Sequence, residues 1–160
     1  MNVNLGVKLT LKSLLRKIAF KKNKKQFYFG HLLTLTAGAT IYLLFREKSL
    51  LMFDWLDIYF SFIDIEALRN SVKDLRPFLP EWFLFSLPDG LWIFSFVSIL
   101  MFTWDNIITR HNFLWIIGVP ILAIFSELGQ INNFIPGTFD TIDLLFYIFG
   151  LLIPIFLFKK

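Results

Sequence analysis

The sequence predicts an all-α membrane protein with four transmembrane helices in one domain. Of its 160 residues, 56% are hydrophobic and 19% are aromatic. That apolar share exceeds the roughly 45–50% that is typical of soluble domains. Four apolar runs, at about 27–45, 87–104, 113–130 and 141–158, are each long enough to cross the hydrocarbon core of a bilayer.

Residue types that are absent or isolated exclude several kinds of site. The chain has no cysteine, and His31 and His111 are far apart, so we expect no disulfide, metal site or cofactor. The net charge of +4 could indicate nucleic acid, but the cations gather beside an apolar run. This pattern indicates a membrane surface, so the expected partners are membrane lipids and not nucleic acid.

Residues 1–26 form a basic segment that contains no acid. Lys8, Lys12 and Arg16 are spaced four residues apart, and apolar residues fall on another face of the same helix. The pattern predicts an amphipathic helix in the headgroup layer, or a solvated basic tail that serves only as a topology signal. Both interpretations place this end in the cytoplasm.

The first span, 27–45, carries a stripe of small residues. Gly30, Thr34 and Gly38 recur every four residues and would allow another helix to approach closely. Residues 37–39 resemble a signal-peptide cleavage site, but the sequence stays apolar beyond them. We therefore expect an uncleaved anchor.

The connection at 46–86 mixes apolar and polar stretches. Residues 50–63 are apolar but interrupted by Asp54 and Asp57, and they predict an interfacial segment. Residues 65–76 predict a polar helix that ends before the prolines at 77 and 80. Ser86 is expected to cap the second span, with Asp89 in its first turn.

The distribution of charge predicts the topology. With the N-terminus inside, eleven of the sixteen lysines and arginines fall on the inner side. The positive-inside rule then places both termini in the cytoplasm, in what we expect to be a bacterial inner or plasma membrane. The connection between the third and fourth spans faces outward in this arrangement.

Three acids surround that outward connection. Glu127 lies near the end of the third span, and Asp140 and Asp143 open the fourth. An acid at the centre of a membrane helix costs roughly 2.5–3.5 kcal/mol on insertion scales, so such acids usually mark a site. The expected ligand-binding residues, which helical spacing places around one outward cavity, are Glu127, Gln130, Asp140, Asp143, Tyr147 and Gly150.

Each acid also has a purely structural interpretation. Asp140 could be the N-cap of the fourth span, with Asp143 reaching back toward it. Glu127 is too near the end of its own span to cap it, and it has no cation within helical reach. Glu127 is therefore the stronger functional candidate of the three.

The acids belong to a longer pattern that resembles a known family. The pattern runs Ser126-Glu127-x-x-Gln130, Pro136-Gly137-Thr138-Phe139-Asp140-x-x-Asp143 and then Gly150. It is similar to the VanZ-like family of small membrane proteins over residues 87–155. Thr138 departs from the arginine that the family usually has after the Pro-Gly pair. The resemblance implies a cell-envelope protein whose founding relative is associated with glycopeptide antibiotic resistance, and it implies no enzymatic activity.

Three functions remain open from the sequence. The first is a non-enzymatic envelope protein that binds a lipid-linked or amphiphilic ligand, or docks a membrane protein partner, at the outward site. The second is an assembly subunit that uses the small-residue stripe of the first span as its interface. The third, an intramembrane hydrolase with paired carboxylates, is disfavoured because no second aspartate is seen to converge from a separate helix. We therefore name no catalytic residue.

Overall fold

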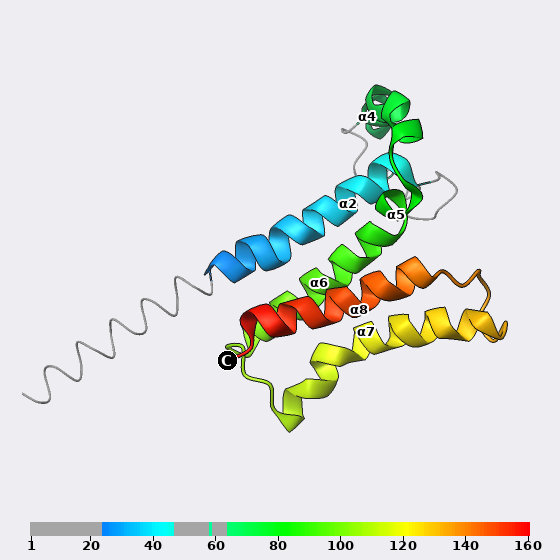
Figure 1. The fold of residues 1–160 in the computed structure, drawn as a ribbon. Helices are drawn as coiled ribbons and strands as arrows, with labels where there is room; N and C mark the ends of the chain where they lie inside the picture. The colour runs from blue at the N-terminus through cyan, green and yellow to red at the C-terminus, as the bar shows by residue number, and fades with distance from the viewer. Residues whose placement is uncertain (1–23, 47–57, 59–63) are drawn as a thin grey trace, which may run out of the picture.

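The fold is a bundle of helices, described here from a computed structural model that covers residues 24–46, 58 and 64–160 (Figure 1). No strand occurs in these residues. The elements, in chain order, are η1 (Gln26–Leu32), α2 (Leu33–Phe45), α4 (Ile65–Val72), η2 (Lys73–Phe78), α5 (Glu81–Leu84), α6 (Ser86–Thr103), α7 (Arg110–Ile131) and α8 (Thr141–Phe158).

Four helices are long and apolar enough to cross a membrane: η1 with α2, α6, α7 and α8. This result confirms the predicted all-α membrane fold with four spans. The predicted basic helix within 1–26 falls almost wholly outside the described residues, and the predicted interfacial segment at 50–63 does so except for residue 58.

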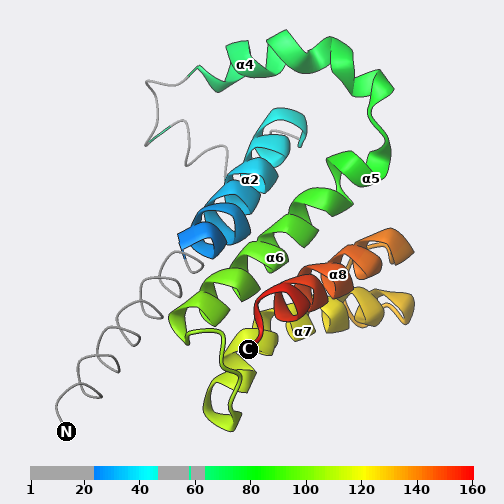
Figure 2. The ribbon, with the colours of Figure 1, turned by 60° about the vertical axis from the view of Figure 1, so that its left-hand side comes forward.

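Helix α6 is the centre of the bundle and the most buried of the four spans. In Figure 2 it lies between α2 and the pair formed by α7 and α8. Its buried residues Ile93, Val97 and Met101 form the apolar core with Ile116 of α7. Large apolar side chains on the outer faces of α7 and α8, such as Leu122 and Phe156, are exposed, as expected for helices that contact lipid.

Two glycines allow α6 and α8 to cross at close range. A Cβ atom added to Gly150 would lie 2.6 Å from the carbonyl oxygen of Gly90, and one added to Gly90 would meet the Phe146 ring at 2.9 Å. Small residues at such crossings let backbones approach and pack well inside a membrane, where lipid tails compete for apolar contacts. This crossing fixes α8 on the central helix.

A buried polar pair ties the beginning of the first span to the α6–α7 connection. The side-chain amides of Gln26 and Asn106 exchange two hydrogen bonds of 2.9 Å, and Gln26 also donates to the Ser98 carbonyl at 3.0 Å. The Lys160 amide donates to the Asn106 carbonyl at 3.1 Å. The residues around Gln26, Asn106 and Lys160 therefore share one end of the bundle, which we call the Asn106 end.

Two helix starts differ from the sequence prediction. Ser86 is not an N-cap, because Phe85 is already helical and α5 leads directly into α6; Ser86 is instead buried. The third span begins at Arg110 rather than near 113. The Asn112 side chain accepts a 2.7 Å hydrogen bond from the Thr109 amide and donates one to the Ile107 carbonyl, which stabilises the earlier start.

Candidate functional site

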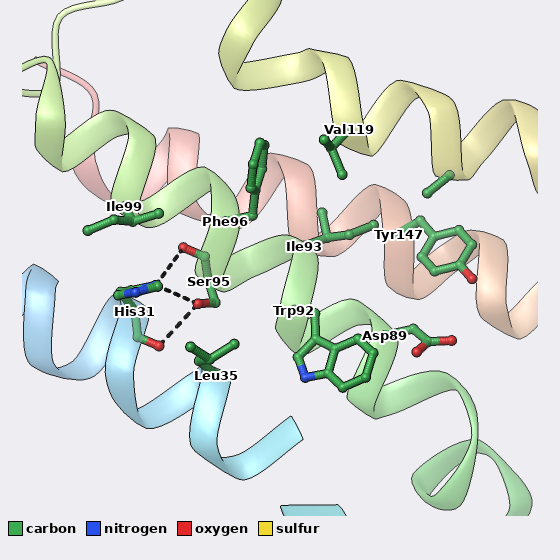
Figure 3. A pocket seen from close by; sticks show the side chains of 11 residues that line it. His31, Leu35, Asp89, Trp92, Ile93, Ser95, Phe96, Ile99, Val119 and Tyr147 are labelled. Atoms are coloured by element: carbon green, nitrogen blue, oxygen red, sulfur yellow. Dashed lines mark hydrogen bonds between the residues drawn. The ribbon is translucent and has the colours of Figure 1, made fainter. Parts of the chain in front are cut away.

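A groove of about 550 Å³ opens along α6, with walls from all four spans (Figure 3). Its walls are mostly apolar, and they include Leu35 of α2, Phe96 of α6 and Val119 of α7. His31 and Ile99 lie toward the Asn106 end of the groove, and Asp89 and Tyr147 lie at the opposite end. We call this opposite end, where Arg46 and Asp89 also meet, the Asp89 end.

The charged group nearest to the groove is an ion pair between the first and second spans. The Arg46 guanidinium lies 3.7 Å from the Asp89 carboxylate, and it donates to the Phe85 carbonyl at 3.5 Å. It also lies over the rings of Tyr42 and Phe85, with its central carbon 5.2 Å and 5.0 Å from the ring centres. Arginine is suited to such stacked, hydrogen-bonded positions because its guanidinium is planar and weakly hydrated.

Further acids surround this ion pair. The carboxylate of Asp89 is repelled by the charges of Glu127 and Asp143, and Tyr147 lies in the field of the same three acids. Among the residues that the structure describes, Arg46 is the one cation in this cluster, so the described acids exceed the described cations. Repulsion between the acids is strongest where water is scarce. A ligand that brings hydrogen-bond donors or positive charge to the Asp89 end would relieve it.

Glu127 joins the ends of α7 and α8. It is only 4% exposed, and its Oε1 accepts a 2.6 Å hydrogen bond from the Asp140 amide. Its Oε2 accepts a longer bond of 3.4 Å from Gln130. The structure thus gives Glu127 a role that its place in the sequence does not suggest: it accepts a hydrogen bond from the N-cap residue of the next span.

The start of α8 explains the positions of the two aspartates. The Asp140 carboxylate accepts a 2.7 Å hydrogen bond from the Ile142 amide, as an N-cap does. In a capping box, Asp143 would accept the Asp140 amide, but Glu127 accepts that hydrogen. Asp143 Oδ1 is consequently buried without a hydrogen-bond partner among the described residues. A buried polar atom without a partner costs about 1–3 kcal/mol of stability. Such atoms are rare in folded proteins, and a functional role is one of the usual reasons for them.

The remaining expected site residues lie in different surroundings. Tyr147 lines the groove, whereas Gly150 is the contact point of α8 with α6. In the small-residue stripe of the first span, Gly30 lies against Ser98 and Phe158, and Gly38 lies under the Trp92 ring. Thr34 donates to the carbonyls of Gly30 and His31 in its own helix.

His31 and Ser95 form a close pair inside the groove. His31 Nδ1 lies 2.7 Å from Ser95 Oγ, and that hydroxyl donates to the His31 carbonyl at 3.1 Å. A serine beside a histidine can act as a nucleophile, but Ser95 is 1% exposed and engages the His31 backbone. We interpret the pair as a connection between the first span and α6. In the part of the chain that the structure describes, no group of three potential ligands could hold a metal ion.

Arg46 and Asp89 are the site residues that sequence reasoning missed. The sequence predicts Asp89 only as a first-turn acid of the second span, and it places Arg46 at the start of the connection that follows the first span. The available signal was an acid within an apolar span, the same feature that singled out Glu127. The structure also shows that Asp89, on α6, approaches Asp143, on α8, so acids from separate helices do converge.

No protein-family model matches the chain, and no curated protein or solved structure matches it either. The resemblance to the VanZ-like family therefore rests on the short motif alone.

Proposed function

We propose that this protein binds an amphiphilic ligand whose apolar chain lies in the groove and whose polar head lies at the Asp89 end. The observation that carries the proposal is the composition of the groove. Its walls are mostly apolar. His31 and Ser95, toward the Asn106 end, are hydrogen-bonded to each other, whereas Asp89 and Tyr147 lie at the opposite end, near the acids of α7 and α8. Ligand sites typically combine apolar walls with a few convergent polar groups in this way.

The excess of acids over cations at the Asp89 end favours a ligand whose polar head donates hydrogen bonds or carries positive charge. Asp89 is paired with Arg46, whereas Asp143 keeps a buried oxygen without a hydrogen-bond partner in the described residues. A head group rich in hydroxyl or amino donors could bond Asp89 and Tyr147, which line the groove, and would offset the negative charge at this end, whereas an anionic one would be repelled. A lipid-linked sugar or an amino-bearing lipid has the required chemistry.

Two other functions have less support. An intramembrane aspartyl hydrolase needs two acids that face each other and share one proton, whereas Asp89 is in an ion pair with Arg46. An assembly subunit that uses Gly30, Thr34 and Gly38 as its interface would need that stripe free. Gly30 and Gly38 are instead occupied by contacts within this chain.

We further propose membership of the VanZ-like family, on the motif from Glu127 to Gly150, and a place in the bacterial cell envelope. In this proposal the Asn106 end faces the cytoplasm and the Asp89 end faces outward, since most cations of the sequence then lie inside. The groove would receive its ligand from the lipid or from the outer surface.

Three amphiphiles with the same acyl chain test the head-group preference. The purified protein, held in lipid nanodiscs, is titrated with a monoacylglycerol, an alkylamine and a fatty acid, and its unfolding temperature is measured. We expect the first two to raise the unfolding temperature and the fatty acid not to. Asp89→Asn should reduce this discrimination. Equal stabilisation by all three, or by none, would contradict the proposal.

A further inference from the structure

A second, smaller pocket lies at the C-terminal end of the first span, the end away from Gln26. It has a volume of about 210 Å³ and is lined by Leu44, Phe45, Arg69, Asn70, Lys73 and Arg76. Three of these six residues are cations and none is an acid. The cations come from α4 and η2, which cross the end of the bundle above α2 (Figure 2).

The pocket is held in place by the C-terminus of α2. Arg69 donates to the carbonyl of Leu43 at 2.6 Å and to the carbonyl of Arg46 at 2.5 Å. These carbonyls form the negative end of the helix dipole, where a cation is favourable. Arg69 therefore anchors α4 to the first span, and Lys73 and Arg76 follow on the exposed continuation of the same segment.

The position of the pocket along the first span indicates its level in the membrane. Leu44 and Phe45 are the last residues of a helix that is long and apolar enough to cross the membrane. A pocket at this position lies at the level of the lipid headgroups, where phosphate groups are found. Arginine and lysine are the side chains that bind phosphate, the former through paired donors.

The apolar side of the same segment supports this placement. Leu68, Leu75 and Phe78 are 52%, 54% and 84% exposed. They recur along the segment at spacings of seven and three, together with the half-buried Ile65 and Val72. A helix that combines an exposed apolar stripe with cations lies in the plane of the membrane surface.

We propose that α4 and η2 form an interfacial element that binds the phosphate of an anionic phospholipid in the pocket between Arg69, Lys73 and Arg76. Leu68, Leu75 and Phe78 enter the apolar side of the headgroup layer, and the cations meet the phosphate. This site is separate from the groove. Its charged side chains are basic, whereas the charged side chain that lines the groove is the acid Asp89.

Lipid retention in native mass spectrometry tests the site. The full chain is extracted from vesicles of equal parts phosphatidylglycerol and phosphatidylcholine, and the retained lipids are compared between variants. Lys73→Gln with Arg76→Gln should reduce the retained phosphatidylglycerol by about tenfold or more, because each cation near a membrane surface contributes about a fivefold preference. Arg110→Gln with Lys159→Gln, a matched pair at the Asn106 end, should leave it unchanged.

The other outcomes separate this site from its alternatives. Equal loss in both double variants, or no loss in either, would overturn the proposal. Displacement of phosphatidylglycerol by millimolar inorganic phosphate would overturn it in favour of a site for small anions. Ala123→Phe, which narrows the groove, should not alter phosphatidylglycerol retention, so failure of this site and failure of the groove proposal are distinguishable.

Discussion

The Arg46 guanidinium and the Asp89 carboxylate lie 3.7 Å apart and connect the end of the first span to the start of the second. Arg46 also links the two candidate sites. Its side chain pairs with an acid that lines the groove, and its carbonyl accepts a hydrogen bond from Arg69, which lines the second, smaller pocket. The first span is thus fixed at the Asp89 end by polar contacts and at the Asn106 end by the amide pair of Gln26.

Replacing one partner of the ion pair should destabilise the protein more than replacing both. In Arg46→Gln, Asp89 is left beside Glu127 and Asp143 without its cation, and we expect a loss of about 1–3 kcal/mol in the free energy of unfolding. A fully buried pair would lose about 3–5 kcal/mol, but these side chains remain 28% and 23% exposed. Arg46→Gln combined with Asp89→Asn should recover part of the loss. Unfolding in mixed micelles measures both, and additive losses would argue against a direct pair.

Glu127 should act through its acceptor oxygen. Glu127→Ala leaves the Asp140 amide without its acceptor, which we expect to cost about 0.5–1.5 kcal/mol of unfolding free energy. Glu127→Gln keeps a carbonyl oxygen in the same place and should lose less. The unfolding temperatures of the two variants provide the measurement. If glutamine were as harmful as alanine, the negative charge rather than the hydrogen bond would be the essential feature.

Replacing Asp143 should stabilise the empty protein. Asp143 Oδ1 is a buried acceptor without a partner in the described residues, and its charge is repelled by Asp89. Asp143→Asn removes the repulsion and supplies donors, so we expect a gain of about 1 kcal/mol in the absence of ligand. The same change should weaken binding of a donor-bearing amphiphile. Loss of stability in Asp143→Asn would show that the carboxylate has a structural partner.

The crossing of α6 and α8 should not tolerate a larger side chain. Gly150→Ala places a methyl group 2.6 Å from the Gly90 carbonyl oxygen, so the helices must separate. We expect a loss of about 1–3 kcal/mol, the usual cost of overpacking. Gly118→Ala on α7 is a matched control, because nothing lies within 4 Å of its added Cβ. Equal unfolding temperatures in the two variants would contradict this packing.

The sequence predicts the membrane helices well because length and apolar composition determine them locally. The four spans observed lie close to those expected. Asp140 is the N-cap of α8, which is the structural interpretation that the sequence offers for it. The groove could not be predicted in the same way. It depends on which face of α6 meets α2, α7 and α8, and on Arg46 reaching an acid more than forty residues away.

Glu127 illustrates the same limit in one residue. Its position within an apolar span correctly marks it as unusual, but its partner is a backbone amide on the far side of the 132–140 connection. Helical spacing alone indicates which residues share a face of one helix. It does not indicate which hydrogen bonds a connection makes when it folds back.

Native mass spectrometry of groove variants shows whether an amphiphile occupies the groove. Ala123 lines the groove, so Ala123→Phe should fill it, whereas Gly118→Phe adds the same ring to an open face of the same helix. We expect the wild type and Gly118→Phe to retain an amphiphile after gentle extraction and Ala123→Phe to lose it. Equal retention by all three proteins would contradict a ligand site in the groove, because the bound molecule would then lie elsewhere.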